Sequence, residues 1–340
     1  MSYEWNLTKA KKQIEYLTNE LSSASKFEKE DIKDGLHFLQ ILTGAKTMAN
    51  LKQNNGDNLT VYKRFSDYSE IVSKASIITS SVQFTDLSYS KVHKSEEEIL
   101  DLTNDFYNRQ NRKWKTLFGK VFNERRNNLS FSEESDTPMM LHIPYLEYFY
   151  ISIPKTGDVR EECSAVHEYA HAVADLINPR ADGMYYKKIL LEVPSLFMEL
   201  ISCDFFKYKS STPMEYTIRQ KQLLDTMILY FDEIYEQHSG SKIEEERTYT
   251  LASNLVSSGL DRLMYAFSYL VAIELLYIYY NNREKAIHYL DQIIQMQDQD
   301  NILEKLAALK ITPGEHLNRY QKKLKKSIEK SNENQDKDEI

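Results

Sequence analysis

The sequence predicts a mainly α-helical protein with one or two short strands, on the evidence of composition and of hydrophobic spacing. Only 9 of the 340 residues are glycine and 7 are proline, whereas ordinary proteins contain about 7% and 5%. All-β sandwiches and barrels need turns rich in these residues, so the composition argues against them. Apolar residues recur instead at helical spacing through much of the chain, and 340 residues can bury a large core.

Charge and cysteine usage limit the partners and the compartment. The chain has 43 Lys and Arg against 51 Asp and Glu, a formal net charge of −8. Nucleic-acid binding needs clustered basic residues, so no nucleic-acid partner is expected. The two cysteines, Cys163 and Cys203, argue against a disulfide framework and suit a reducing compartment. The first residues, MSYEWNLTKAKK, lack the apolar segment of a secretory signal, so a cytoplasmic location is expected.

The N-terminal third reads as helices separated by polar breaks. Two helices are expected over residues 1–50, and a polar loop over residues 51–60. Residues 61–90 mix helical and β-branched signals and stay open. A serine followed by three glutamates is typical of a helix start and predicts a helix over residues 95–127. The polar residues 127–138 predict a linker, the best candidate for a domain boundary.

After this linker the pattern changes. Aromatic and β-branched residues in Pro138–Pro154 predict one or two short strands, followed by a turn and a helix over residues 159–177. Further helices are expected over residues 186–208, 213–238, 244–281, 283–297 and 302–331. The highly charged stretch Ser327–Ile340 predicts a frayed or disordered end.

One apolar segment tests the expectation of a soluble protein. Residues 263–280 read LMYAFSYLVAIELLYIYY, and their length reaches the lower limit for a membrane span. However, Glu274 stands in the middle of the segment, and a glutamate at the centre of a bilayer is costly. We therefore expect a buried core helix and no membrane partner.

The motif with most chemical content is His167-Glu168-Tyr169-Ala170-His171, an HExxH pattern. Residues four apart share one face of a helix, so both imidazoles can reach one ion. The intervening Glu168 can then face a water molecule at that ion. The alternative is a pair of helix-surface histidines that happen to flank a glutamate.

A catalytic zinc needs a third protein ligand, and the candidates are Asp175, Asp182, Glu192 and Glu199. Glu192 is favoured because it lies 21 residues after His171, which leaves room for the helix to end and the chain to return. It also lies in the apolar run LLEVPSLFMEL, where a buried carboxylate needs a partner. The alternative is a glutamate stabilised by the helix dipole at a helix start.

Together these segments resemble metallopeptidase family M3, the group of thimet oligopeptidase and oligoendopeptidase F. HEYAHAVADLI is similar to the family's HExGH helix, and LLEVPSLFMELISCDFF is similar to its E-x-x-S-x-x-x-E helix. Glu192, Ser195 and Glu199 match that second pattern position by position. The resemblance covers about residues 145–280 and implies one Zn²⁺ per chain.

The resemblance also implies a role for each matching residue. His167, His171 and Glu192 would be the zinc ligands, with Ser195 and Glu199 supporting them. Met264–Tyr269 (MYAFSY) resembles the family's tyrosine-rich helix, so Tyr265 and Tyr269 are candidate hydrogen-bond donors to the oxyanion of the reaction. For either tyrosine the alternative is packing in the core.

The fold implied is a zincin-like helical metallopeptidase with a small β-sheet or edge strand next to the active-site helix. Residues 1–130 would form one wall of a cleft, residues 131–318 the catalytic region, and residues 319–340 a charged helix end and tail. The implied activity is hydrolysis of internal bonds of oligopeptides by a metal-activated water, with Glu168 as general base. The oligomeric state stays open.

Departures from the family pattern keep an alternative function open. The family's glycine in HExGH is Ala170 here, and the middle tyrosine of the aromatic motif is Phe267. The chain is also much shorter than typical members. These differences are compatible with a catalytically weak or inactive zinc protein that binds a peptide or a protein partner.

Overall fold

The computed structural model describes most of the chain from residue 56 onward. The described residues are 15, 18, 19, 56–80, 89–91, 93–123, 127–133, 138–143, 148–178, 189–239, 260–296 and 301–338. The two helices predicted over residues 1–50 lie almost wholly outside this part of the chain, as do Asp182 and the first part of the helix predicted over residues 244–281.

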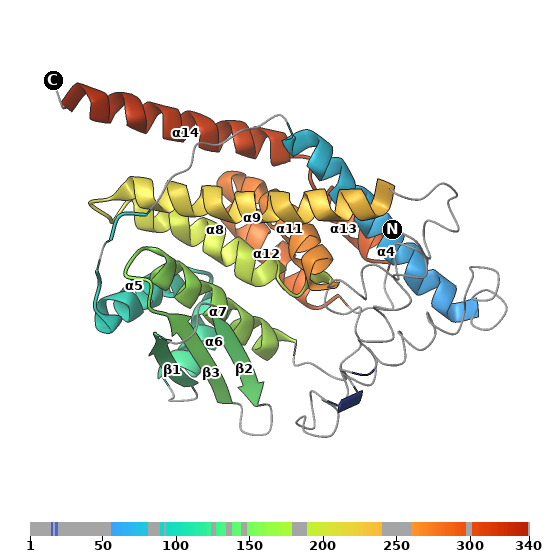
Figure 1. The fold of residues 1–340 in the computed structure, drawn as a ribbon. Coiled ribbons are helices and arrows are strands. Elements are labelled where there is room, and N and C mark those ends of the chain that lie inside the picture. Colours follow the sequence, from blue (N-terminus) through green and yellow to red (C-terminus); the bar gives the residue numbers. More distant parts are fainter. Residues whose placement is uncertain are drawn as a thin grey trace.

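The described residues confirm a mainly helical fold with one small sheet (Figure 1). The strands are β1 (Asn127–Ser132), β2 (Met139–Ile143) and β3 (Tyr148–Pro154). The helices are α4 (Gly56–Thr79), α5 (Glu96–Asn108), α6 (Arg112–Asn123), α7 (Arg160–Ile177), α8 (Val193–Lys207), α9 (Pro213–Ser239), α11 (Leu260–Asn281), α12 (Arg283–Ile294), α13 (Ile302–Ala308) and α14 (Leu317–Asp338).

Where one or two strands were expected from Pro138–Pro154 the sheet has two, and it also contains a third strand that was not expected. Its strand order is β1-β3-β2, with β1 parallel and β2 antiparallel to β3. The linker prediction for residues 127–138 is wrong over its first half, because residues 127–132 form β1. Leu129 pairs with Ile151 and Phe131 with Ile153, so these two apolar residues hold an otherwise polar segment in the sheet. The predicted region boundary after residue 130 falls inside β1.

The helix predicted over residues 95–127 is in fact two helices. Its start is as expected: Ser95 and Glu98 form a capping box at the first turn of α5. The chain leaves the helix after Asn108, and the Asn111 side chain accepts a hydrogen bond from the Trp114 N–H at 2.9 Å. Asn111 thus provides the first turn of α6 with the kind of side-chain acceptor that favours a new helix start.

Helix α4 covers the first part of residues 61–90, the segment that the sequence left open. It begins at Gly56, inside the predicted polar loop, and continues to Thr79. Tyr68, Val72 and Ala75 are buried along it at the helical spacing of three and four residues, where α4 contacts α9 and α11. The β-branched residues of this segment up to Thr79 therefore lie in a helix and not in a strand.

The end of the chain also differs from the prediction. The helix expected over residues 302–331 is broken by Pro313 and Gly314, and Gly314 adopts a positive φ of 86° that favours glycine. After this break α14 continues to Asp338, so the prediction of a frayed or disordered end from Ser327 is wrong.

The apolar helix α11 lies inside the structure. Residues 262–281 are long and apolar enough to cross a membrane by length and composition alone, but 78% of the apolar window is buried. The acidic side chain in the middle of this segment, Glu274, accepts hydrogen bonds from the His316 N–H at 2.8 Å and from His316 Nδ1 at 2.6 Å. The buried carboxylate is thereby satisfied within the protein, as expected for a core helix.

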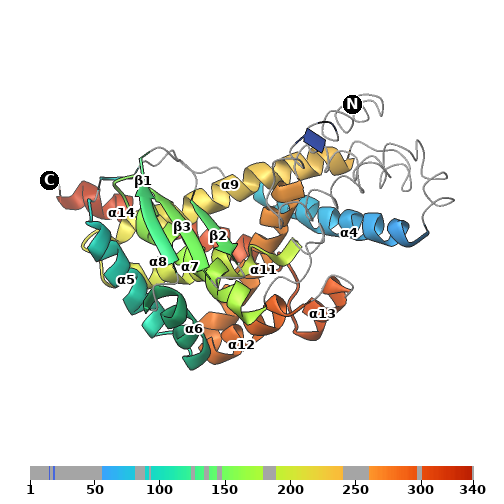
Figure 2. The ribbon, with the colours of Figure 1, turned by 90° about the horizontal axis from the view of Figure 1, so that it is seen from below.

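Helix α7 occupies the centre of the arrangement (Figures 1 and 2). It contacts β2, β3, α5 and α6 on the side of the sheet and α8 on the other side. Every residue from Glu161 to Val173 is buried, so the helix has no solvent-facing stripe along this stretch. Polar side chains on α7 must therefore find their partners inside the protein.

A buried tyrosine fixes α7 against α5. Tyr107 stacks on Phe118 with ring centroids 4.3 Å apart, and its hydroxyl donates to the Val166 carbonyl at 2.7 Å. The contact joins the two helices one residue before the HExxH motif.

Tyr107→Phe is expected to destabilise the protein by about 1 kcal/mol, because it removes one buried hydrogen bond without changing the shape of the ring. Denaturant unfolding of the two proteins measures the difference. Tyr208→Phe is the matched control, because Tyr208 is 92% exposed and its change should leave the unfolding free energy unaltered. Equal effects of the two substitutions would contradict the role of Tyr107.

Candidate metal centre

The turn before α7 sets where the motif helix begins. Gly157 has a positive φ of 70°, and a Cβ at this position would lie 2.9 Å from Cε1 of His93. Asp158 accepts hydrogen bonds from the backbone N–H and the guanidinium of Arg160. The turn therefore needs a glycine for close approach and an aspartate that pairs with the first residue of the helix.

The two motif histidines lie on one face of α7. His167 and His171 are both buried, with ring centroids 5.0 Å apart. This is the arrangement that four-residue spacing predicts for a helix.

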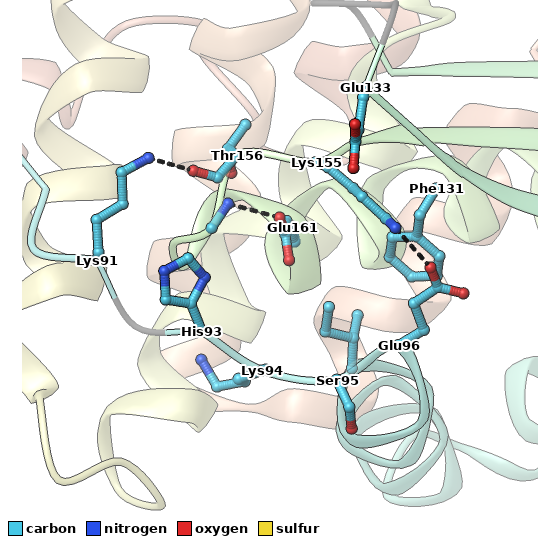
Figure 3. Close-up of a pocket in the computed structure, with 12 residues that line it drawn as sticks. Lys91, His93, Lys94, Ser95, Glu96, Phe131, Glu133, Lys155, Thr156 and Glu161 are labelled. Atoms are coloured by element: carbon cyan, nitrogen blue, oxygen red, sulfur yellow. Dashed lines mark hydrogen bonds and ion pairs between the residues drawn. The ribbon is translucent and has the colours of Figure 1, made fainter.

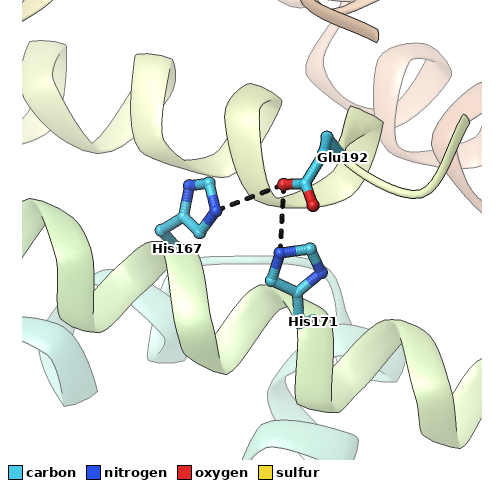
Figure 4. A group of neighbouring side chains, drawn as sticks. All are labelled: His167, His171 and Glu192. Atoms are coloured by element: carbon cyan, nitrogen blue, oxygen red, sulfur yellow. Dashed lines mark ion pairs between the residues drawn. The ribbon is translucent and has the colours of Figure 1, made fainter. Parts of the chain in front are cut away.

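Glu192 approaches both rings from the start of α8 (Figure 4). Its Oε2 lies 3.4 Å from Nε2 of His167 and 3.2 Å from Nε2 of His171. Ser195 Oγ lies 3.0 Å from the same carboxylate oxygen and 3.0 Å from the Glu192 carbonyl oxygen, and its hydroxyl is the donor. The structure thus brings Glu192 next to the two histidines and Ser195 next to Glu192.

Glu199 and an arginine that sequence reasoning missed complete the surroundings. Glu199 Oε2 lies 3.0 Å from Nδ1 of His167, and Arg219 Nε donates to Glu199 Oε1 at 2.7 Å. Arg219 comes from α9, which carries no recognisable motif. The only sequence signal for Arg219 is its position three residues after Tyr216 and four before Leu223, both of which are buried on that helix.

Burial and the neighbouring carboxylates determine the charge of the group formed by His167, His171 and Glu192. Burial by itself would lower the pKa of His167, but Glu192, Glu199 and Glu168 raise the pKa to about 10. Burial tends to raise the pKa of Glu192, but the two histidines hold it well below its usual range. The metal-free group therefore keeps a proton on a ring nitrogen among ionised carboxylates, which is the charge distribution that a cation could replace.

Glu168 is also buried within α7, beside the first histidine. Burial raises the pKa of its carboxyl, although His167 and His171 pull the pKa down. A buried carboxylate with a raised pKa accepts a proton more readily at neutral pH than an exposed one does.

The donor set of this group fits zinc. One ring nitrogen from each histidine and one carboxylate oxygen of Glu192 lie within 4.8 Å of one another, and all three residues are buried. Two imidazoles and one carboxylate, with a further position left open, are the ligands of many catalytic zinc sites. Neither Asp175 nor Glu199 belongs to this group.

A second group with possible ligand atoms lies elsewhere, where α11 meets the start of α14. It consists of Glu274, Glu315 and His316. Both oxygens of Glu274 already accept hydrogen bonds from His316, and Glu315 is exposed. Glu274 and His316 are therefore engaged with each other, at the break between α13 and α14.

The two candidate tyrosines lie in different surroundings on α11. Tyr269 is fully buried next to Tyr320, and burial raises its pKa well above the usual range. Tyr265 is half-buried, with its ring 6.5 Å from that of Tyr230. Ser268, one turn after Tyr265, donates to the Ile189 carbonyl at 2.9 Å, which ties α11 to the segment that leads to Glu192. The role of either tyrosine stays a prediction.

The two cysteines lie between the helices that carry the group. Cys163 and Cys203 are buried free thiols whose sulfur atoms are 3.7 Å apart. Cys163 stands one turn before His167 on α7, but neither thiol belongs to the group of possible ligands.

A cavity of about 470 Å³ lies beside the entry to α7 (Figure 3). Lys155 pairs with Glu96 at 3.1 Å, and Lys91 donates to the Thr156 carbonyl at 2.7 Å. The Gly157 N–H donates to Glu161 at 2.6 Å. None of the residues lining the cavity belongs to the histidine and glutamate group, so the cavity is separate from that group.

Solved structures with the same fold are peptidases. One is a crystal structure from Bacillus anthracis str. Ames that is described as an oligoendopeptidase F. It matches with a TM-score of 0.52 and 14% identity, over 92% of this chain and 63% of that chain. PZ peptidase A, solved with an inhibitor, matches with a TM-score of 0.56 and 12% identity, over 91% of this chain and 66% of that chain. The sequence matches no family model and no curated protein.

The chain therefore has the helical fold of these peptidases, which confirms the predicted fold class. It spans slightly less than two thirds of the length of the two matching structures.

Binding of Zn²⁺ at pH 7 is expected to release about one proton per chain, because the proton held by His167 must leave before its ring nitrogen becomes a ligand. Since the pKa of His167 is raised to about 10, zinc affinity should rise by roughly tenfold per pH unit across the neutral range.

Calorimetric titration with Zn²⁺ in two buffers of different ionisation enthalpy measures this proton release. The binding enthalpy should differ between the buffers in proportion to the protons released. A binding enthalpy that is the same in both buffers would show that His167 is neutral before the metal binds.

Proposed function

We propose that the chain is a zinc-dependent peptidase that hydrolyses internal bonds of oligopeptides. The observation that carries the proposal is the buried group of His167, His171 and Glu192, with Glu168 beside it, in a chain with a peptidase fold. Peptidase activity accounts for Glu168 as well as for the ligands, whereas a purely structural metal site has no use for that glutamate.

In this proposal the residues of the chain divide the chemistry between them. His167, His171 and Glu192 hold the zinc, and Ser195 keeps the Glu192 carboxylate in place through its hydroxyl. When bound, zinc supplies a Lewis acid for the scissile carbonyl and lowers the pKa of the attacking water. Glu168 takes a proton from that water and delivers it to the leaving amine, and its raised pKa favours the first of these transfers.

We assign the hydrogen bond to the developing oxyanion to Tyr265 in preference to Tyr269. Tyr265 is half-buried, whereas Tyr269 has no exposed surface and packs in the core. Access of a substrate to Tyr269 would require α11 to separate from its neighbours, which buried packing opposes.

We further propose that residues 1–130 contribute the opposite wall of a peptide cleft and that the protein works in the cytoplasm. The buried free thiols Cys163 and Cys203 suit a reducing compartment. A catalytically weak protein that only binds a peptide is the less favoured alternative, since Glu168 is retained and buried beside the first histidine.

Glu168→Gln is expected to keep its zinc and to lose cleavage by a factor of about 10² to 10⁴, because the amide cannot take up the proton of the water. Zinc content and cleavage of a mixed library of quenched fluorescent peptides are measured on the same samples. Glu236→Gln, at an exposed position of α9, is the control and should cleave like the wild type. A zinc-loaded wild type that cleaves no peptide would favour the binding alternative.

Glu192→Ala is expected to weaken zinc binding by more than about 100-fold, because it removes a ligand and not only a supporting group. Competition with a chromogenic chelator gives the dissociation constant. Glu315→Ala is the matched control, since Glu315 belongs to the other group of possible ligands. Full zinc affinity in Glu192→Ala, or a loss in Glu315→Ala, would refute the assignment of the ligands.

A further inference from the structure

Arg219 reaches the metal group from a helix that contributes no ligand to it. Its Nε lies 2.7 Å and its Nη2 2.5 Å from Oε1 of Glu199. Two guanidinium nitrogens thus contact a single carboxylate oxygen, Nε through a hydrogen bond and Nη2 as part of the ion pair. The Arg219 side chain is 18% exposed and the Glu199 side chain 1% exposed, so water competes little with this ion pair.

The other oxygen of the same carboxylate faces the first motif histidine. Glu199 Oε2 lies 3.0 Å from Nδ1 of His167. Each carboxylate oxygen of Glu199 therefore has its own partner: Oε1 contacts the Arg219 guanidinium and Oε2 contacts the His167 imidazole. A carboxylate fixed at one oxygen has little freedom to turn the other away.

The orientation of the His167 ring depends on this contact. With Nδ1 directed at Glu199, the opposite nitrogen Nε2 points toward Glu192, at 3.4 Å from its Oε2. The partner of one ring nitrogen fixes both the tautomer and the direction of the other nitrogen. With Glu199 at Nδ1, the ring presents Nε2 to the side on which Glu192 lies.

We propose that Arg219 is a positioning residue of the zinc site, which acts on His167 through Glu199. This inference rests on the proposed zinc function of the group. Arg219 touches neither the ligand atoms nor the substrate in this scheme, and its effect passes through one carboxylate.

Arg219 has a further neighbour besides Glu199, the side chain of Tyr89. The guanidinium of Arg160 lies 5.0 Å from the centre of the Tyr89 ring. Arg160 is the first residue of α7. The support of the His167 ring is therefore connected to the start of the helix that carries the ring.

The test compares Arg219→Gln and Arg219→Lys with the wild type. Arg262→Gln is the matched control, because Arg262 also pairs with a glutamate across two helices, Glu233 of α9, and neither residue belongs to the metal group. Zinc dissociation constants are measured by chelator competition, and the visible absorption spectrum of the Co²⁺-loaded protein reports the geometry of the ligands. Circular dichroism of the metal-free proteins identifies any variant that does not fold.

Arg219→Gln should bind zinc about 10- to 100-fold more weakly and shift the Co²⁺ spectrum, as loss of a group that supports a ligand does. Arg219→Lys keeps the charge without the contact by two nitrogens, so it should recover part of the affinity. Arg262→Gln should behave like the wild type. A folded Arg219→Gln with wild-type affinity and spectrum would overturn the proposal. Should Arg219→Gln not fold, the lysine variant decides by the same two measurements.

A double-mutant cycle tests the route of the effect. In a Glu199→Gln background, Arg219→Gln should add little further loss of zinc affinity, because the group through which it acts is already altered. Additive losses would overturn the proposed route. A wild type that binds zinc but cleaves no peptide would contradict the peptidase function and leave this comparison intact.

Discussion

Burial of the motif helix is the constraint from which the rest of the site follows. Helix α7 is enclosed from Glu161 to Val173 between the sheet side of the fold and α8. Imidazoles and carboxylates in such a position carry a large desolvation cost unless they are paired or bind a metal. The contacts of His167 and His171 with Glu192 therefore offset part of this cost where α7 and α8 pack together, and they also assemble the groups for any chemistry at the site.

The same constraint explains why the site is built from several helices. Three carboxylates, those of Glu168, Glu192 and Glu199, lie near the two imidazoles, and the guanidinium of Arg219 pairs with Glu199. With both imidazoles neutral, the buried group has a net negative charge. A bound cation would offset that charge, and without a metal the proton on His167 offsets part of it. Stability of the core and metal binding are thus linked through one set of side chains.

The sequence predicted those features that depend on local spacing. The HExxH pattern placed two histidines on one face of α7, and the E-x-x-S-x-x-x-E pattern placed Glu192, Ser195 and Glu199 along the start of α8. These predictions succeeded because a helix converts sequence spacing directly into direction.

Features that depend on tertiary contacts were missed. Strand β1 has the polar sequence NNLSFS and is held by the pairing of Leu129 and Phe131 with β3. Arg219 reads as one charged residue of a long amphipathic helix, and its partner lies 20 residues earlier in the chain. The break between α5 and α6 rests on a single asparagine, Asn111. None of these has a periodic signal that could be recognised without the fold.

X-ray absorption at the zinc edge of the loaded wild-type protein tests the central claim most directly. The account predicts one zinc per chain with only nitrogen and oxygen ligands at about 2.0–2.2 Å, as two histidines and one glutamate require. Sulfur scattering at about 2.3 Å would instead implicate a thiolate, for which Cys163 and Cys203 are the only sources in the sequence. Sulfur ligation, or the absence of stoichiometric zinc, would contradict the assignment of His167, His171 and Glu192.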